Sequence, residues 1–176
     1  MTEPDQTHRE LLDSFRSAMR HVAATVYAVT TGHGGDRYGI LATAVSSLSF
    51  DPPSLLVCVH RAASLHAPLA QADRFCINVL GLGNRDVADQ FMSGSRGDRF
   101  AVGEWEEWHG LPMLATAQSS LVCRKADCHE FGTHTIFIGA LLAAKHRADA
   151  APLTYYDRHY IDISEAPQCP ALGEGA

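Results

Sequence analysis

The segment of residues 38–60 constrains the fold of this chain more than any other. Its centre, residues 42–49, is made almost entirely of small or hydroxyl-bearing side chains, which offer little apolar bulk to a core. The Asp51-Pro52-Pro53 sequence predicts a turn, because proline fixes φ and cannot donate a ladder hydrogen bond. The apolar run 55–59 has the length of a buried strand. The segment is therefore predicted to fold as strand, turn and strand, with a backbone that can pass close to a flat or phosphorylated ligand.

Hydrophobic periodicity predicts the secondary structure along the rest of the chain. Helices are predicted at residues 8–22, where Thr7-His8-Arg9-Glu10 forms a capping box, at 65–72 and at 85–92, with Ser64 and Asn84 as the caps of the last two. Strands are predicted at residues 25–31, 37–50, 55–59, 75–80, 118–125, 133–144, 153–156 and 159–163. Polar or glycine-rich sequence predicts loops at residues 32–36, 93–100 and 126–132, while 105–112 shows no assignable pattern. The mostly hairpin-like spacing favours a mainly β fold, a β-barrel with peripheral helices, over a βαβ array.

The composition argues for a globular protein and against nucleic-acid or membrane partners. Its 46% hydrophobic and 19% charged residues are a globular balance, and 176 residues fit a single domain, 1–176, with a core at about 11–163 and a loose tail at 164–176. The net charge of -6, with no basic cluster to offset it, argues against a nucleic-acid or anionic-membrane surface. No apolar run approaches the length of a membrane span.

The start of the chain and its cysteines favour a cytoplasmic location. The first nine residues are polar and do not resemble a signal peptide. The cysteines are odd in number: Cys58, Cys76, Cys123, Cys128 and Cys169. Two of them lie in apolar, strand-like runs, which suits reduced and buried thiols.

Residues 39–59 also carry a family resemblance, centred on Ser46-Ser47-Leu48-Ser49-Phe50-Asp51-Pro52-Pro53. This segment resembles the signature of the short-chain flavin reductases, the NAD(P)H:flavin oxidoreductase components of two-component monooxygenases. The likeness extends over about residues 15–161, with its motifs in order and no large insertion. It implies an FMN-binding split barrel, a Greek-key antiparallel fold that is usually a homodimer with flavin near the subunit interface.

The best candidates for the flavin site lie in the small-residue segment: Thr43, Ala44, Val45, Ser46 and Ser47. Reduction of a flavin places negative charge on the N1–C2 carbonyl edge of its ring. Backbone N–H groups and hydroxyls aimed at that edge stabilise the charge without a catalytic base. The alternative is a strand lined with small residues for close packing.

The resemblance places the flavin phosphate or ribityl chain near a second group of residues: Cys58, Val59, His60, Ser64 and His66. Ser64 begins a predicted helix, whose unpaired N–H groups and dipole favour an anion. The alternative role of Ser64 is that of a helix cap, and the two roles can coexist. Arg61 could add positive charge. The chain departs from the family at His60, where Asn is frequent, and at His66 and Leu41, where Thr is frequent, so the choice between FMN and FAD stays open.

Two further motifs resemble family segments. Gly97-Asp98-Arg99-Phe100 resembles the loop that reaches the flavin phosphate, with Arg99 as the charge partner beside Asp98 and Phe100. Residues 132–139 match the family's Gly-Asp-His-Thr-Ile-Phe-Ile-Gly strand, with Thr133 in place of Asp. The resemblance places His134, the candidate catalytic residue, at the flavin face where the nicotinamide stacks, and Tyr160 near the nicotinamide side. Strand packing is an equal explanation for the neighbouring Tyr155.

Three other patterns compete with this interpretation. Gly81-Leu82-Gly83-Asn84-Arg85-Asp86 follows a strand and opens a helix, but Asp86 stands where a dinucleotide fingerprint needs its third glycine. Cys123, Cys128, His129 and His134 could be read as zinc ligands, but their spacing is irregular, so no metal is predicted. No Gly-x-Ser-x-Gly motif supports a serine hydrolase.

The resemblance therefore implies NAD(P)H-dependent reduction of FMN or FAD, and delivery of the reduced flavin by diffusion to a flavin-dependent monooxygenase. Two alternatives stay open on the same fold, a flavin-binding protein without reductase turnover and a flavoenzyme that reduces another acceptor such as a corrinoid or an organic substrate. A metal-binding structural module is a third alternative. The sequence does not distinguish NADH from NADPH.

Overall fold

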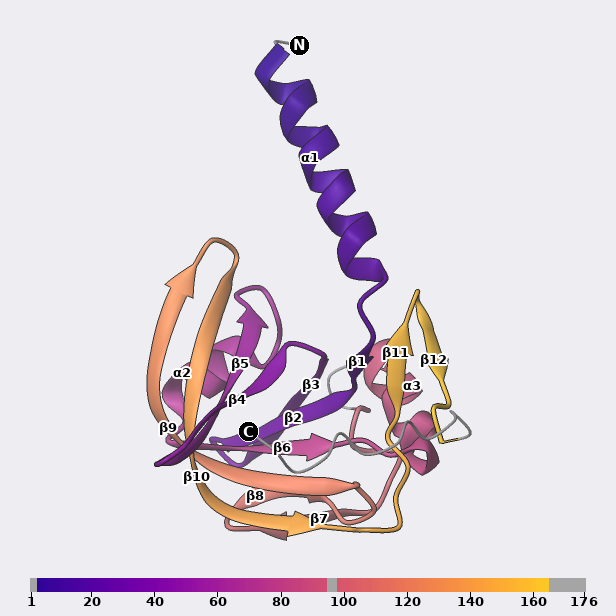
Figure 1. Ribbon diagram of the computed structural model, residues 1–176. Coiled ribbons are helices and arrows are strands. Elements are labelled where there is room, and N and C mark those ends of the chain that lie inside the picture. The colour runs from indigo at the N-terminus through magenta and orange to yellow at the C-terminus, as the bar shows by residue number, and fades with distance from the viewer. Residues whose placement is uncertain (1–2, 95–97, 165–176) are drawn as a thin grey trace.

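The computed structural model describes residues 3–94 and 98–164, with side chains described from residue 7 onward. In these residues the main element is a seven-stranded antiparallel sheet with the order β3-β2-β6-β9-β10-β5-β4 (Figure 1). Its strands are β2 (Tyr27–His33), β3 (Asp36–Ala42), β4 (Val45–Phe50), β5 (Pro53–His60), β6 (Arg74–Val79), β9 (Ser119–Phe131) and β10 (His134–His146). The long β9–β10 hairpin, joined by Gly132 and Thr133, forms its centre.

Smaller elements surround this sheet. The described residues also form a sheet of β1 (Ala24–Thr25), β11 (Thr154–Tyr156) and β12 (His159–Ile161), and a hairpin of β7 (Trp105–Trp108) and β8 (Leu111–Leu114). The helices are α1 (Glu3–Arg20), α2 (His66–Gln71) and α3 (Arg85–Ser93), with a 3-10 turn, η1 (Leu82–Asn84), before α3. None of the helices in the described part of the chain is long and apolar enough to cross a membrane.

The two edges of the large sheet are consecutive in sequence. β3 and β4 are its outermost strands, yet only Thr43 and Ala44 separate them. The sheet therefore curls until its edges approach one another, and the Cys58 amide donates to the Ala44 carbonyl oxygen at 3.0 Å. The connection from β5 through α2 to β6 passes over the β9–β10 hairpin, as in a Greek key. The predicted antiparallel β-barrel with peripheral helices is confirmed.

The core follows from the alternation of side chains along the strands. Leu55, Val57 and Val59 of β5 are buried while the residues between them are not. They pack with Phe75, Ile77 and Phe137 inside the curled sheet, while α3 covers the outer face of β3 with a second cluster that contains Phe91. The barrel interior is thus filled with side chains, and ligands must bind at its rim or outer surface.

Several predictions of secondary structure are wrong. The capping box predicted at Thr7-His8-Arg9-Glu10 lies inside α1, and the strand predicted at 25–31 is divided between β1 and β2. The strand predicted at 37–50 is two strands, because the chain leaves β3 at Thr43 to reach the opposite edge of the sheet. The loop predicted at 126–132 is mostly strand, because β9 and β10 continue to a two-residue turn. Ser64 does not cap α2, whose N-cap is Leu65. The unassigned segment 105–112 forms most of the β7–β8 hairpin.

Two predicted segments fall partly or wholly outside the described residues. The loop predicted at 93–100 includes residues 95–97, and the loose tail predicted from Ser164 includes residues 165–176; neither range is described.

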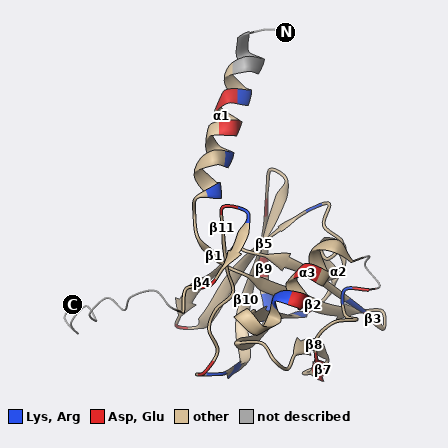
Figure 2. Cartoon of the chain, turned by 90° about the vertical axis from the view of Figure 1, so that its right-hand side faces the viewer, with Lys and Arg blue, Asp and Glu red and all other residues tan. Residues whose placement is uncertain are grey.

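α1 is long, begins earlier than predicted and projects away from the sheets in both views (Figures 1 and 2). Its apolar residues at helical spacing are largely exposed: Leu11, Leu12, Phe15 and Met19. Charged residues of both signs lie along the helix (Figure 2). The helix is therefore amphipathic, as predicted, but no element of this chain covers its apolar face among the described residues.

Candidate flavin site

The predicted flavin segment lies where the two edges of the sheet meet. Thr43, Ala44, Ser46 and Ser47 are exposed, while Val45 is half-buried against the core. β4 pairs with β5 on one side only, so its other side directs backbone N–H and C=O groups away from the sheet. The small side chains leave these groups accessible. This segment therefore offers an exposed strand edge with backbone groups and hydroxyls, among which the Ser46 hydroxyl donates to the Ser47 carbonyl oxygen at 3.1 Å.

Arg99 ties this edge to the segment after β5. Its Nη1 donates to the Gly39 carbonyl oxygen of β3 at 2.7 Å and to Ser64 Oγ at 2.6 Å. Its Nε is buried and has no hydrogen-bond partner among the described residues. Asp98, by contrast, is exposed, and its carbonyl oxygen accepts from the Gln90 side chain at 2.9 Å, which holds the turn in place. The predicted pair thus divides into a solvent-facing Asp98 and an Arg99 that points into the protein.

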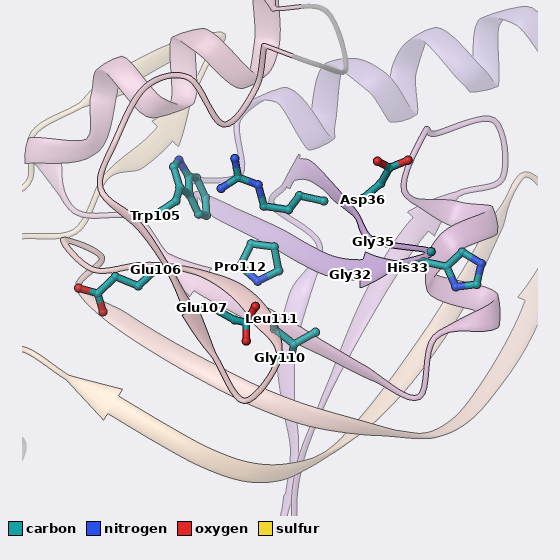
Figure 3. A pocket seen from close by; sticks show the side chains of 12 residues that line it. Gly32, His33, Gly35, Asp36, Trp105, Glu106, Glu107, Gly110, Leu111 and Pro112 are labelled. Carbon is teal, nitrogen blue, oxygen red and sulfur yellow. The ribbon is translucent and has the colours of Figure 1, made fainter.

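Phe100 lies on the outer face of β3. Its ring meets Phe91 at 5.6 Å and Trp105 at 4.9 Å between centroids, both edge-on. A Cβ on Gly39 would lie 2.8 Å from Phe91 and 3.2 Å from Phe100, so this position requires glycine. The other side of the cluster carries Arg37, whose guanidinium carbon lies 4.9 Å from the Phe100 centroid. A hollow of about 430 Å³ opens beside Arg37 and Trp105 (Figure 3).

The predicted histidines gather at the start of β10. His134 pairs with His60 across the β5–β10 ladder, and their rings meet edge-on at 4.9 Å. The Ala62 amide donates to His60 Nδ1 at 3.0 Å, so the neutral ring of His60 carries its proton on Nε2. Thr133 Oγ1 lies 2.9 Å from His134 Nδ1. The residue that replaces the family's Asp therefore still supplies a polar partner that orients the His134 ring.

The remaining residues of the second predicted group have different surroundings. His66 Nε2 lies 2.8 Å from Thr135 Oγ1 of β10. Cys58 is half-buried, and the side chain of Val59 is fully buried in the core, so Val59 can offer a ligand only its backbone. Arg61 donates to the Gly132 carbonyl oxygen at 2.6 Å and forms an exposed ion pair with Glu130. These contacts fix the segment after β5 against the β9–β10 turn.

Tyr160 lines a second, apolar hollow of about 220 Å³ near Thr43. The Tyr160 ring contacts Tyr155 at 5.7 Å and lies under the Arg85 guanidinium at 5.9 Å. Partial burial, and then the charge of Asp89, raise the pKa of the Tyr160 phenol, which therefore stays neutral at physiological pH. Tyr155, Tyr160 and Thr43 thus share one hollow. Leu41, a departure from the family in the sequence, also lines it, and sequence analysis did not anticipate its other walls: Val26, Ala42 and Met92.

Cys123 and Cys128 do not lie together. Cys123 is fully buried in the core, and burial raises the pKa of its thiol to about 12. Cys128 is exposed and lies five residues further along β9, which at about 3.3 Å per residue is roughly 16 Å away. A single ion cannot be bound by both sulfurs.

Comparison with known proteins identifies the family. The family described as "Flavin reductase like domain" matches residues 19–164. The FMN reductase (NADH) RutF of Pseudomonas syringae pv. syringae strain B728a is 38% identical over 157 residues, which are 88% of each chain. The reductase component of an FADH(2)-dependent resorcinol hydroxylase from Rhizobium sp. strain MTP-10005 is 37% identical over 157 residues, 87% of this chain and 88% of that protein.

A solved structure agrees with these sequence matches. The NADH:FAD oxidoreductase SgcE6 of Streptomyces globisporus C-1027, in complex with NAD and FAD fragments, superposes with a TM-score of 0.82 at 25% identity, over 96% of this chain and 99% of that one. The curled sheet, the family match across most of the chain and the relatives over most of their length lead to one conclusion: this chain belongs to the flavin reductase like family.

Proposed function

We propose that this chain transfers hydride from NADH or NADPH to FMN or FAD, at the edge of the sheet between β3 and β4. The observation that carries the proposal is Arg99, which joins Gly39 of β3 to Ser64 and keeps a buried Nε without a partner among the described residues. A buried donor that lacks an acceptor costs about 1–3 kcal/mol. A phosphate or carbonyl oxygen of a bound flavin would remove that cost. The similarity to named NADH-dependent flavin reductases supports NADH as the donor.

The residues present fit a flavin. The exposed small residues of 43–47 suit a flat ring, and the free backbone donors of the β4 edge suit its carbonyl groups. The guanidinium of Arg99 and the hydroxyl of Ser64 suit a phosphate. The apolar hollow lined by Tyr155 and Tyr160 suits a ring that must be shielded from water.

When bound, the flavin supplies the hydride-accepting ring and the nicotinamide supplies the hydride. The residues of this chain act by position and charge. The N–H groups and hydroxyls at Ser46 and Ser47 stabilise the negative charge that reduction brings, and need no proton transfer. His134, held by Thr133 and His60, orients the polar groups of the donor. Because both reactants are held in place at the edge of the barrel, less entropy is lost on the way to the transition state of hydride transfer, and the barrier is lower.

The test is anaerobic titration with flavin followed by addition of NADH or NADPH, while absorbance of the oxidised flavin is recorded. Arg99→Ala is expected to raise the Kd of FMN at least about tenfold, because it removes a charge-assisted contact of about 1.5–3 kcal/mol. His134→Ala is expected to slow bleaching with little change in Kd. Arg74→Ala removes an exposed arginine from β6 and serves as the control.

Each outcome of this test has a distinct meaning. Flavin binding without bleaching by either nucleotide would favour the alternative of a flavin-binding protein without turnover. Absence of flavin binding in the unaltered protein would overturn the proposed site itself.

We further propose that the reduced flavin leaves this chain and serves a flavin-dependent monooxygenase. The support is the similarity over 157 residues to a protein named as the reductase component of a hydroxylase. Because the candidate segment 43–47 is exposed, a flavin held there can exchange with solvent. The four described cysteines are free thiols, which supports a cytoplasmic location.

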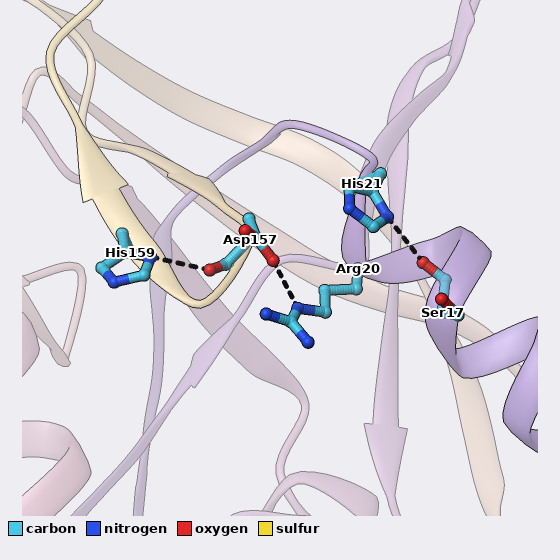
Figure 4. Close-up of polar contacts among 5 residues, drawn as sticks. All are labelled: Ser17, Arg20, His21, Asp157 and His159. Atoms are coloured by element: carbon cyan, nitrogen blue, oxygen red, sulfur yellow. Dashed lines mark hydrogen bonds and ion pairs between the residues drawn. The ribbon is translucent and has the colours of Figure 1, made fainter.

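We also propose a homodimer, on the basis of α1. Leu11, Phe15 and Met19 are 67%, 61% and 50% exposed, an apolar stripe that a helix in water normally buries. The last turn of α1 is anchored to the β11–β12 turn. Arg20 forms an ion pair with Asp157 (Figure 4), and the Asp157 amide donates to the Arg20 carbonyl oxygen at 3.1 Å. The helix is thus held in a projecting position, where a second copy of the chain can cover its apolar face.

A further inference from the structure

Two positions at which this chain departs from the flavin reductase pattern lie against one side chain, that of His134. Thr133 stands where the pattern has Asp, and His60 stands where Asn is frequent. Thr133 Oγ1 lies 2.9 Å from His134 Nδ1. The His60 ring lies at the end of β5, which pairs with the start of β10, and it meets the His134 ring edge-on at 4.9 Å between centroids. The two departures therefore act on the same ring.

Thr133 alone holds the His134 ring loosely. A hydroxyl can donate or accept, so the contact at 2.9 Å is compatible with a proton on either nitrogen of the ring. A carboxylate at this position could only accept, which would keep a proton on Nδ1, and its charge would make the hydrogen bond about twice as strong. Thr133 and His134 are both exposed, so the core does not restrain the ring either. The orientation of His134 therefore depends on a second contact.

The His60 ring is fixed well enough to supply that contact. The Ala62 amide donates to His60 Nδ1 at 3.0 Å, which sets both the orientation of the ring and its Nε2–H tautomer. The backbone is tied in the same place, because the Arg61 amide donates to the Thr133 carbonyl oxygen at 2.9 Å. The Arg61 side chain also donates to the Gly132 carbonyl oxygen at 2.6 Å. The segment that carries His60 is thus held against the turn before β10.

An asparagine at position 60 could make only one of the two contacts of His60. Its Oδ1 is bonded to Cγ, as Nδ1 is in histidine, so it could accept from the Ala62 amide in the same way. It has no ring to meet His134, and an edge-to-face pair of aromatic rings stabilises their arrangement beyond simple burial. The ring is therefore what histidine adds at this position.

We propose that His60 is a positioning residue, whose ring fixes the orientation of His134 where the Thr133 hydroxyl does not. The inference rests on the proposed function, in which His134 orients the hydride donor. It implies that positions 60 and 133 are coupled, because the ring at 60 is needed only while position 133 has no carboxylate. A side chain that merely stabilised the β5–β10 ladder would show no such dependence.

The first test separates the ring of His60 from its hydrogen bond. His60→Asn keeps an acceptor for the Ala62 amide and removes the ring, so it is expected to lower kcat for FMN reduction by about threefold to tenfold, the effect of one aromatic pair. The KM of NADH and the Kd of FMN should stay within about twofold, because the contact acts in the transition state and not in binding. His60→Phe keeps a ring and loses the acceptor, and is expected to retain more activity than His60→Asn. The control is His129→Ala, which removes an exposed histidine of β9 and should change neither kcat nor KM.

The second test is a pair of double-mutant cycles on kcat. In a Thr133→Asp background, His60→Asn is expected to lower kcat by less than about twofold, because the carboxylate then holds His134. In a His134→Ala background, His60→Asn should have no further effect, since the side chain through which it acts is gone. Nitrogen NMR of the imidazole rings, which needs no turnover, should show His60 with an unprotonated Nδ1 and a protonated Nε2.

Several results would overturn the inference. His60→Asn could leave kcat unchanged, or lower it equally in the Thr133→Asp or His134→Ala background. His60→Phe could be less active than His60→Asn, or the His60 ring could carry its proton on Nδ1. Each of these results, in a protein that still reduces FMN, leaves the proposed function intact. Absence of FMN reduction by the unaltered protein would instead overturn the proposed function, and this inference with it.

Discussion

Gly139 is the residue at which the core of β10 is most tightly packed. A Cβ there would lie 2.6 Å from Phe75 Cζ and 2.7 Å from Cys123 Cβ, so both neighbours would have to move. Gly139→Ala is therefore expected to lower the free energy of unfolding by about 1–3 kcal/mol, the usual cost of overpacking. Urea denaturation measures the change. Gly83→Ala, where a Cβ would meet nothing within 4 Å, is the control, and equal stability of the two variants would contradict the packing argument.

The buried thiols of Cys76 and Cys123 are expected to make the folded protein less stable at alkaline pH. Burial raises the pKa of each thiol from 9.0 to about 12, with the nearby Cys123 adding to the effect at Cys76. Because the pKa of each thiol is higher in the folded state than in the unfolded state, the free energy of unfolding is at its full value below about pH 9. It decreases as pH rises from 9 towards 12. In that range, ionisation of each thiol is expected to lower the free energy of unfolding by on the order of 1.4 kcal/mol per pH unit.

Urea unfolding at pH 8 and pH 10.5 measures this loss. Cys123→Ala should reduce the slope, whereas Cys128→Ser, at an exposed thiol, should not. A slope that Cys123→Ala leaves unchanged would show that other groups carry the alkaline sensitivity.

The sequence predicts single residues of the site better than it predicts the residues that they contact. The sequence motif identifies Arg99, but its contacts with Gly39 and Ser64 join segments 60 and 35 residues away, which no local pattern records. For the same reason Ser64 was predicted as a helix cap, although its hydroxyl accepts from Arg99. Gly39 carried a readable signal, since a glycine inside a strand often marks close approach of another group.

Among the elements, the β11–β12 hairpin contains a strained turn. Asp157 and Arg158 connect the strands with φ of 46° and 67°, the left-handed region that a two-residue turn of this kind requires at both positions. Arginine is poorly suited to it, while Asp-Gly is a preferred pair. Arg158→Gly is therefore expected to raise the free energy of unfolding by up to about 1 kcal/mol. Thermal unfolding tests this, and Arg158→Ala, which keeps the strain, should give no gain.

The elements themselves show where periodicity succeeds and fails. The continuous apolar run 55–59 predicted β5, and the structure buries its alternate residues Leu55, Val57 and Val59. The outer half of β9 escaped prediction because residues 126–131 are exposed and carry no apolar alternation. The break at Thr43 also escaped, because it arises from closure of the sheet and not from a local breaker.

At the scale of the whole molecule, the position of α1 leaves apolar surface that no other element in the described part of the chain covers. Full burial of one large apolar side chain contributes about 1.5–3 kcal/mol, so three such side chains on α1 could supply much of a dimer's stability. Phe50, 88% exposed on the edge strand β4, adds to the same kind of surface. The family resemblance also implies a homodimer, with flavin near the subunit interface.

The test of this arrangement is the mass of the protein in solution by light scattering. The unaltered chain is expected at about twice 19.1 kDa, and a variant with Leu11→Ser, Phe15→Ser and Met19→Ser should weaken association at least about a hundredfold and become monomeric at low micromolar concentration. The control, Asp13→Ser with Arg16→Ser, removes only an exposed ion pair from the same helix, which is worth little, and should remain a dimer. If the serine variant keeps the dimer mass, α1 does not lie in the interface. If it becomes monomeric and also loses flavin affinity, the second copy completes the site at the edge of the sheet.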